Sequence, residues 1–421
     1  MTQIHDEIKK DRQIWKFSLY GFLKDLTFFE PYLLIYLMGL GLNLFQIGLL
    51  FAVREAITYI FEVPSGVFAD HYGKKKELLI CFSFYIVSFI FFFIGTHVAI
   101  ISIGMVFFGL GEAFRSGTHK AMIYTYLEQK SWFAHKTYVY GRTRSFSLLG
   151  GSISSFMSIL FILNLPSARW IFALSIIPYV LDFMLILSYP DSLDEKRVHK
   201  WHWKDFLIEN VVQVKMIFKH FELSKILVSS SLYDGIFKSI KDYIQPIMKV
   251  TILASVGVGL FKSSFMEKMQ PDDTIVIVLG MTYGIFYLFS AWVSKNVHKL
   301  NRYFDSAKLM TYSFDLMGVF VLALSFAVKS NAIVLIVALF FILNMMKDAR
   351  RPLFVDVCGD YMVKEQRATV MSVDSQLKAL FVVILAPVLG FVADRMSIQV
   401  LFLGLAVFIF TINRVIKIEP K

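Results

Sequence analysis

GVFADHYGKKKEL, residues 66–78, lies directly between two long apolar stretches of the chain. Small and acidic residues followed by three lysines are costly in hydrocarbon, so we expect this segment to form a tight turn at a membrane surface. Gly66 and Gly73 allow the backbone to reverse sharply, and Lys74 to Lys76 favour the cytoplasmic side. The segment therefore predicts a polytopic membrane protein with a short inside loop after its second helix.

The composition of the whole chain agrees with that expectation. Of the 421 residues, 57% are hydrophobic and 43 are phenylalanine, and the mean hydropathy is +0.61. Soluble domains contain about 45–50% apolar residues, so a helical membrane protein is the class that fits. A net charge of +11 raises the alternative of nucleic-acid binding, but the basic residues fall mainly between apolar runs. Solvated loops explain them better, and we expect no nucleic-acid partner.

The chain shows no sign of a disulfide, a metal site or a cofactor. Its two cysteines, Cys81 and Cys358, each lie inside an apolar run, so we expect neither a structural disulfide nor a cysteine metal site, and no cofactor. The first apolar run follows a charged segment and is too long for a cleavable signal peptide. We expect it to remain as the first membrane helix.

Apolar runs long enough to cross a bilayer occur twelve times, since a spanning helix needs about 20 mostly apolar residues. The expected spans lie near 16–38, 44–67, 77–96, 99–127, 138–163, 168–189, 224–252, 273–296, 306–328, 331–358, 368–394 and 398–416. Basic residues cluster before the first span and after the second, fourth and eighth, whereas the connections near 39–43, 97–98 and 164–167 carry none. This asymmetry places both termini in the cytoplasm of a multi-pass protein of the cell (inner) membrane.

The longest hydrophilic segment, near 190–223, divides the spans six and six. We therefore predict an N-terminal bundle over 1–189, a linker over 190–223 and a C-terminal bundle over 224–421. Apolar residues recur at helical spacing within the linker, which predicts an amphipathic helix on the cytoplasmic membrane face; a plain tether is the alternative. Ser18-Leu19-Tyr20 and Ser231-Leu232-Tyr233 begin similar stretches in the two halves. These matches favour an all-α fold of two related six-helix bundles.

Charged residues inside the expected spans are candidates for function. A charge at the centre of a membrane helix costs about 2.5–3.5 kcal/mol on insertion scales, so it should face a cavity or a partner. Such residues concentrate on the first, fourth, seventh and tenth spans and share stripes at spacings of three or four. The substrate-binding candidates are Tyr20, Lys24, Arg115, His119, Tyr233, Asp234, Lys238, Lys241, Asn344, Lys347, Asp348 and Arg351.

The alternative for each stripe is an internal salt bridge that only allows the charges to be buried. The candidate pairs are Glu112 with Arg115, Asp234 with Lys238, and Lys347 with Asp348. Stripes on four separate helices are a costly way to stabilise a fold, so we favour a polar substrate path.

The turn motif carries a resemblance to a known family. Gly66, Asp70, Gly73, Lys74 and Lys75 occupy the positions of the loop between the second and third helices of the major facilitator superfamily, and this motif resembles that loop closely. The resemblance implies a twelve-helix bacterial permease, whose first, fourth, seventh and tenth helices line a central cavity. This places the four stripes on cavity helices.

The resemblance also implies a cytoplasmic gate. In the family, the motif's carboxylate and basic residues join a charge network that latches the two halves together, and Glu128 and Arg142 hold positions that would complete it here. His71 stands where the family often has arginine, which weakens that contact. The alternative is a basic loop that only sets the topology.

A secondary active transporter working by alternating access follows from the resemblance, with the small-molecule substrate, protons and the lipid bilayer as partners of a monomer. We expect proton-coupled export, with Asp25, Glu30 and Glu112 as candidate proton carriers; uptake of an organic anion by symport or exchange is the alternative. The basic stripes favour an anionic or zwitterionic substrate.

A multidrug antiporter is disfavoured because Ser154 and Ser155 stand where its Gly-Pro pair would be. A membrane enzyme or sensor is the alternative from another class. However, the chain has no nucleotide-binding glycine loop, His-Glu-x-x-His or nucleophile elbow, so we expect no enzyme.

Overall fold

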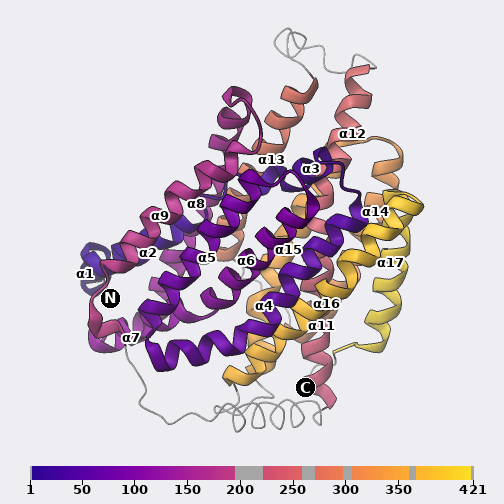
Figure 1. Cartoon of the computed structure of the whole chain (residues 1–421). Helices are drawn as coiled ribbons and strands as arrows, with labels where there is room; N and C mark the ends of the chain where they lie inside the picture. Colours follow the sequence, from indigo (N-terminus) through magenta and orange to yellow (C-terminus); the bar gives the residue numbers. More distant parts are fainter. Residues whose placement is uncertain (1, 195–220, 258–270, 297–305, 360–366, 419–421) are drawn as a thin grey trace. The chain divides into compact units, whose positions relative to one another are not determined.

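The computed structural model describes residues 2–194, 221–257, 271–296, 306–359 and 367–418. Within these ranges the chain is helical and contains no strand (Figure 1). Nine helical segments in this part of the chain are long and apolar enough to cross a membrane. The remaining expected spans, near 16–38, 224–252 and 331–358, are also helical but are interrupted or carry more charge. The all-α polytopic fold is therefore confirmed.

The chain folds into two compact units. Unit 1 consists of Met1–Leu40, Val53–His199 and Val276–Ala291, and unit 2 of Gly41–Ala52, Lys200–Ile275 and Trp292–Lys421. The expected bundle boundaries at 189 and 224 stay a prediction. The amphipathic helix expected in the linker falls on 195–220, which lie outside the described residues.

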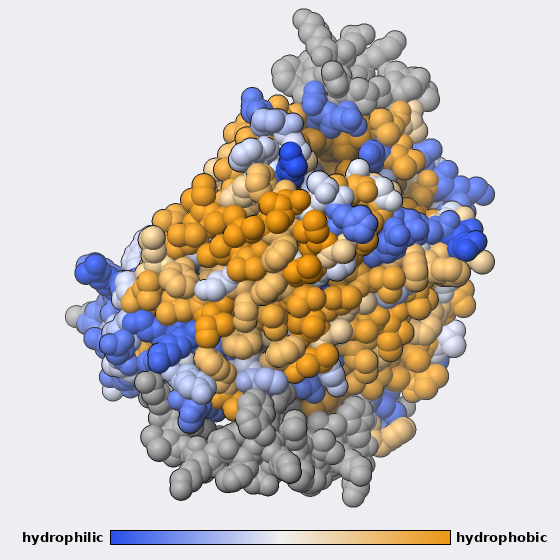
Figure 2. All heavy atoms as spheres, in the orientation of Figure 1, coloured by the Kyte–Doolittle hydropathy of each residue, from blue (hydrophilic) through white to orange (hydrophobic). Residues whose placement is uncertain are grey.

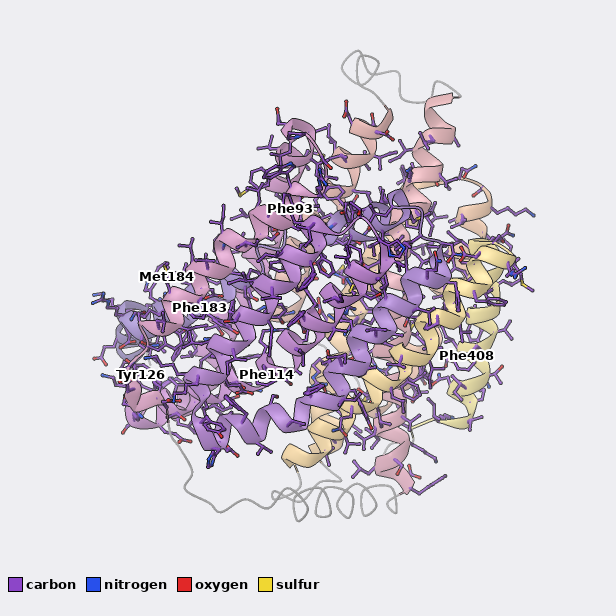
Figure 3. All side chains as sticks on the ribbon, in the orientation of Figure 1. Phe93, Phe114, Tyr126, Phe183, Met184 and Phe408 are labelled. Atoms are coloured by element: carbon purple, nitrogen blue, oxygen red, sulfur yellow. The ribbon has the colours of Figure 1, made fainter. Side chains whose placement is uncertain are left out.

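Unit 1 is built around α5, which packs against α6 and α9, while α2 packs against α8 and α9 (Figure 1). Its helices are α1 (Thr2–Lys10), α2 (Arg12–Lys24), α3 (Leu33–Gly39), α5 (Lys74–Ile94), α6 (Val98–Arg115), α7 (Thr118–Gln129), α8 (Lys136–Asn164) and α9 (Trp170–Leu187), together with α4 (Leu44–Tyr72) from Val53 onward; the first residues of α4, up to Ala52, belong to unit 2. Aromatic pairs join its helices: Phe114 meets Phe84 edge to face with centroids 5.4 Å apart, and Phe93 meets Trp170 at 4.9 Å (Figure 3). Edge-to-face pairs add to the stabilisation by area burial alone.

Close approach of α2 and α8 depends on glycine. A methyl group at Gly150 would clash with the carbonyl oxygen of Phe22, and one at Gly21 would lie 2.9 Å from that of Thr143. Small residues at helix interfaces let the backbones of membrane helices approach each other. These two glycines therefore set the distance between the two helices.

Three spans expected to be continuous are interrupted. The first helix stops at Lys24 and resumes with the 3-10 turn Glu30–Tyr32, and the seventh is broken by the 3-10 turn Lys241–Tyr243 between α11 and α12. Pro31 and Pro246 follow these breaks; a proline ring clashes with the carbonyl four residues earlier and lacks an amide donor. The fourth helix breaks at Gly117, whose φ of +78° is left-handed. Each of these three spans therefore consists of more than one helical segment.

The expected turn over residues 66–78 is wrong in extent. α4 continues through the motif to Tyr72, so Gly66 and Asp70 are helical, and only Gly73 reverses the chain, with φ +105°. A methyl group at Gly73 would clash with Oδ1 of Asp194. That same oxygen accepts a hydrogen bond of 2.9 Å from the Lys75 amide at the start of α5. Glycine is required here by both the φ angle and the adjacent carboxylate.

Unit 2 is built from α11 packed against α16 and from α14 packed against α15 and α17. Its helices are α11 (Phe221–Ile240), α12 (Ile244–Gly257), α14 (Ser306–Lys329), α15 (Ile333–Gly359), α16 (Arg367–Arg395) and α17 (Ile398–Val415); α13 (Pro271–Asn296) has residues in both units. A cluster of buried apolar residues, including Leu227, Met310 and Phe354, joins α11, α14 and α15.

Apolar side chains also cover much of the exposed surface of the helices. On the face in Figure 2, hydrophobic residues dominate the helical surfaces. Met184 of α9 and Phe408 of α17 are 59% and 40% exposed (Figure 3). Large exposed apolar areas are rare on soluble monomers but are normal for helices in lipid.

Candidate functional site

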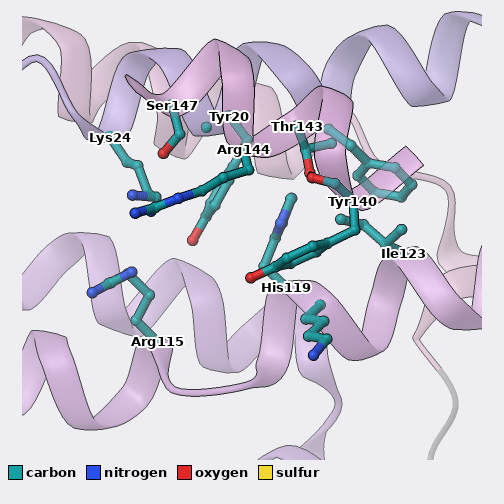
Figure 4. A pocket seen from close by; sticks show the side chains of 12 residues that line it. Tyr20, Lys24, Arg115, His119, Ile123, Tyr140, Thr143, Arg144 and Ser147 are labelled. Carbon is teal, nitrogen blue, oxygen red and sulfur yellow. The ribbon is translucent and has the colours of Figure 1, made fainter. Parts of the chain in front are cut away.

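A cavity of about 170 Å³ opens within unit 1. α2, α6, α7 and α8 contribute its lining residues: Phe17, Tyr20, Gly21, Lys24, Arg115, His119, Lys120, Ile123, Tyr140, Thr143, Arg144 and Ser147. Figure 4 shows Lys24, Arg115 and Arg144 reaching this space from three different helices. The structure thus brings together four of the predicted substrate residues, namely Tyr20, Lys24, Arg115 and His119.

Two of the cations in the cavity are paired with carboxylates. Lys24 at the end of α2 donates to the next residue, Asp25, which also accepts from Ser147 of α8. Arg115 lies 2.7 Å from Glu112, and Tyr85 links the two. The internal salt bridge considered for Glu112 and Arg115 is therefore present. Because both pairs are partly exposed, their charges stay within reach of a solute in the cavity.

Two further cations are not neutralised in this way. Within the described ranges, Arg144 has no hydrogen bond or ion pair, and Lys120 contacts only the rings of Tyr124 and Tyr140, at 5.5 and 5.1 Å. An aromatic face attracts a cation but does not cancel its charge. The cavity therefore keeps a positive excess, and a bound anion would meet Arg144 without first displacing a carboxylate.

Aromatic rings form the floor of the cavity. Tyr20 stacks on His119 with ring centroids 3.6 Å apart, and Phe17 meets the same imidazole edge to face at 5.3 Å. Nε2 of His119 lies 3.1 Å from the hydroxyl oxygen of Tyr189. Because protein groups engage both the ring and one nitrogen of His119, unit 1 itself fixes the position of this side chain.

The third predicted proton carrier, Glu30, lies apart from these pairs. It begins the 3-10 turn that follows the break in the first helix and accepts a hydrogen bond from Tyr287 of α13. Asp25 and Glu112 are each held by a cation. All three carboxylates therefore have a partner within unit 1.

The predicted gate residues differ in their contacts and burial. Nζ of Lys75 lies 2.9 Å from the carbonyl oxygen of Tyr189 and 3.0 Å from Asp191, just after α9. Lys74 lies 3.4 Å from the Thr125 hydroxyl, and Asp70 is half-buried. The lysines of the motif therefore attach the start of α5 to neighbouring segments of unit 1.

Arg142 and Glu128 are not joined to this group. The Arg142 guanidinium lies over the rings of Trp15 and Phe146, at 5.6 and 6.0 Å, and Glu128 is exposed near the end of α7. No contact between Arg142 and Asp70 occurs within the described part of the chain. The latch expected between the two halves stays a prediction.

In unit 2 the charges of three helices form one network. Asp234 of α11 lies 2.5 Å from Lys378 of α16, and Asp374 lies 2.6 Å from Arg351 of α15. Lys378 is also 3.9 Å from Asp374, which accepts a hydrogen bond from Ser231. The structure therefore pairs Asp234 with Lys378 and not with Lys238, the candidate partner in the salt-bridge alternative.

The other predicted residues of unit 2 lie near this network or form local pairs. Lys347 lies 3.0 Å from Asp348, as the salt-bridge alternative expected, and Lys241 lies 3.0 Å from Asp242 at the helix break. Tyr233 is fully buried beneath the guanidinium of Arg350, 4.3 Å away. Asn344 and Lys238 are half-buried on α15 and α11.

Sequence reasoning missed several charged residues. Arg144, Asp182, Arg350, Asp374 and Lys378 all lie inside expected spans. The signal was available, because the rule that a charge inside a span needs a reason applies to every helix. Four of these residues lie on spans other than the four that resemble cavity helices, whereas Arg350 lies on the tenth span. No group of three or more metal-ligating side chains occurs among the described residues.

Comparison with known proteins gives matches along most of the chain. The sequence profile of the Major Facilitator Superfamily matches residues 22–373. An uncharacterized MFS-type transporter of Bacillus subtilis (strain 168), YxaM, is 24% identical over 395 residues, covering 93% of this chain and 92% of the relative.

Solved structures of transporters share the fold. The nucleoside transporter NupG, in a mutant form, superposes with a TM-score of 0.78 at 13% identity, covering 96% of this chain and 98% of that one. A POT family transporter in complex with 5-aminolevulinic acid gives a TM-score of 0.69 at 14% identity, covering 96% and 93%. At such identities the likeness shows the fold alone.

Proposed function

Because this chain belongs to the major facilitator superfamily, it is a membrane transporter rather than an enzyme, and we propose that it moves a small anionic or zwitterionic solute by alternating access. The observation that carries the substrate class is the positive excess of the cavity in unit 1. Arg144 and Lys120 line that cavity without a carboxylate partner among the described residues, beside the paired Lys24 and Arg115.

The chemistry of the lining suits an anionic group. A guanidinium presents several donors in a planar fork that matches a carboxylate or a phosphate. The hydroxyls of Thr143 and Ser147 and the stacked rings of Tyr20 and His119 supply further polar and apolar contacts. A cavity of about 170 Å³ suits a small solute, since one water occupies about 30 Å³ in the liquid.

Alternating access needs an element that favours one of two conformations. We assign this role to the gate motif, Gly66, Asp70, Gly73, Lys74 and Lys75, with Glu128 and Arg142 joining it in one state only. An ion pair that exists in a single conformation shifts the equilibrium between the two by its free energy. Support comes from the resemblance of the motif and from the half-buried position of Asp70 at the end of α4.

Direction and coupling follow from the same resemblance. The proposed protein is a monomer of the cell membrane with both termini in the cytoplasm, and it exports its substrate in exchange for protons. Uptake of an organic anion by symport or exchange is the second candidate, favoured by the basic cavity itself. Asp25, Glu30 and Glu112 are the proton carriers expected from sequence.

Transport by the full-length protein in proteoliposomes tests the proposal. The probes are inorganic phosphate, a monocarboxylate, a dicarboxylate and an amino acid, with an uncharged sugar as reference, each with and without an imposed pH gradient. We expect at least one anion or zwitterion to be transported and the sugar not to be. Opposite effects of inward and outward gradients separate export from symport.

Arg144→Gln provides the residue-level test. Losing a charge-assisted hydrogen bond of about 1.5–3 kcal/mol should lower transport at limiting substrate by about tenfold or more. Arg169→Gln is the matched control, because Arg169 lies at the start of α9 near Phe93 and does not line the cavity. Equal transport by both variants and the wild type would contradict a substrate role for the cavity.

A further inference from the structure

Asp182 is a buried acidic residue for which the proposed transport has no role so far. It lies in the middle of α9, is 0% exposed, and neither of its carboxyl oxygens has a hydrogen-bond partner within the described ranges. In the sequence, Asp182 is a single acidic residue within an apolar run. Buried polar groups without a hydrogen-bond partner are rare in native structures, so each one needs an explanation.

The titratable side chains that interact electrostatically with Asp182 lie on α2, on α5 and in the chain just after α9. α2 contributes Tyr20 and Lys24, Asp25 follows directly, α5 contributes Cys81, and Tyr189 lies beyond the end of α9. Lys24 is the only ammonium or guanidinium among these groups. In the structure Lys24 pairs instead with Asp25, so the buried acid has a cation nearby that is engaged elsewhere.

The turn of α9 that precedes Asp182 contacts the end of α2, a helix that lines the cavity. Tyr179 donates a hydrogen bond of 2.8 Å to the carbonyl oxygen of Lys24, at the point where α2 ends. The Tyr20 hydroxyl, which also acts on Asp182, is buried without a hydrogen-bond partner in the described part of the chain. Two buried polar groups without a hydrogen-bond partner among the described residues, the Asp182 carboxyl and the Tyr20 hydroxyl, thus interact with each other, and Tyr20 itself lines the cavity.

An ionised carboxylate in such surroundings is costly, and the usual outcome is that the group takes up a proton and becomes neutral. Pairing with Lys24 would reverse this preference, since a buried ion pair is far more stable than a lone buried charge. The charge of Asp182 therefore depends on which carboxylate Lys24 contacts.

We infer that Asp182 is the inner proton-binding site of the transporter and that Lys24 controls it by pairing with either Asp25 or Asp182. When Lys24 pairs with Asp25, Asp182 holds the proton. When the ammonium moves to Asp182, the proton passes to the vacated Asp25 carboxylate, so the total charge is unchanged. Asp25 is partly exposed beside the cavity and exchanges the proton with water. The inference rests on proton coupling in the proposed function.

Infrared spectroscopy of the purified full-length protein in lipid vesicles tests this without any substrate. The C=O stretching band of protonated carboxyl groups at neutral pH should lose intensity in Asp182→Asn. The same intensity should be lost in Asp25→Asn, because Lys24 then has only Asp182 as a partner and ionises it. A band unchanged by Asp182→Asn, or a band that survives Asp25→Asn, overturns the inference.

Glu77→Gln is the matched control. Glu77 of α5 is also fully buried, but it accepts a hydrogen bond of 2.6 Å from Thr118 and has no lysine as a partner among the described residues. Its contribution to the band should persist in Asp25→Asn. If Asp182→Asn fails to fold, the wild-type protein and Asp25→Asn still decide the result. Transport by Arg144→Gln tests the substrate assignment only, so a failure of this inference can be distinguished from a failure of that assignment.

Discussion

Unit 1 and unit 2 both place charged side chains within their helices, but they compensate these charges differently. In unit 1 the cavity keeps a positive excess, because Arg144 and Lys120 have no carboxylate partner within the described ranges. In unit 2 Asp234 and Asp374 are tied to Lys378 and Arg351 across three helices.

The exposure of the carboxylates differs as well. Glu112 of unit 1 is 32% exposed, whereas Asp374 of unit 2 is 1% exposed; their partners Arg115 and Arg351 are 31% and 48% exposed. A charge that water or a solute can reach can stay uncompensated, but a charge sealed among helices needs a partner. Under the proposed function, the charges of unit 1 serve recognition of the substrate, whereas those of unit 2 join its helices.

The largest effect is expected from breaking the network of unit 2. Asp374→Asn removes the partner of Arg351 and one partner of Lys378. Loss of one member of a fully buried ion pair typically costs about 3–5 kcal/mol; because Asp374 is 1% exposed but Arg351 is 48% exposed, we expect a loss below that range. Thermal unfolding of the purified protein measures this. Glu222→Gln is the control in the same unit, because both members of its pair with Lys225 are partly exposed and such pairs are worth at most about 1 kcal/mol. Equal unfolding temperatures for the two variants would show that the network does not hold unit 2 together.

An intermediate effect on stability is expected from substitutions at the close contact between α2 and α8, two helices that line the cavity of unit 1. Gly150→Ala places a methyl group against the backbone at Phe22 and should destabilise by about 1–3 kcal/mol, as overpacking does. Gly141→Ala on the same helix meets nothing within 4 Å and should stabilise by about 0.5–1 kcal/mol through helix propensity. Thermal unfolding measures both changes in stability. A change in the same direction for the two variants would contradict the packing argument.

The smallest effect is expected from removing a carboxylate that pairs with a cation of the cavity in unit 1. Glu112→Gln removes the carboxylate that competes for Arg115, so anions should bind more tightly, by up to about 1 kcal/mol or about fivefold in affinity. Equilibrium binding of whichever probe anion is transported measures it. Glu222→Gln again serves as the control, because its carboxylate lies outside the cavity. Unchanged or weaker binding by Glu112→Gln would mean that Arg115 does not contact the solute.

Part of the site could be predicted because helical spacing is local information. Residues three apart on a helix are neighbours on one face, so the pairing of Glu112 with Arg115 followed from their positions. The pairing of Asp234 with Lys378 did not, because it joins helices far apart in sequence. The interruption of the first and seventh helices near Pro31 and Pro246 was readable from sequence but was overlooked.

That the chain is a helical membrane protein, and which of its helices carry charge, follows from the amino-acid sequence alone. Hydropathy, proline and glycine act on the segment that contains them, so a single segment reveals their effect. Which charges are compensated emerges only when the helices pack: Lys378 closes a network, Arg144 stays open to a cavity, and Asp182 is buried without a hydrogen-bond partner among the described residues. The reason is that Coulomb energy and desolvation depend on distances between helices, which no single segment contains.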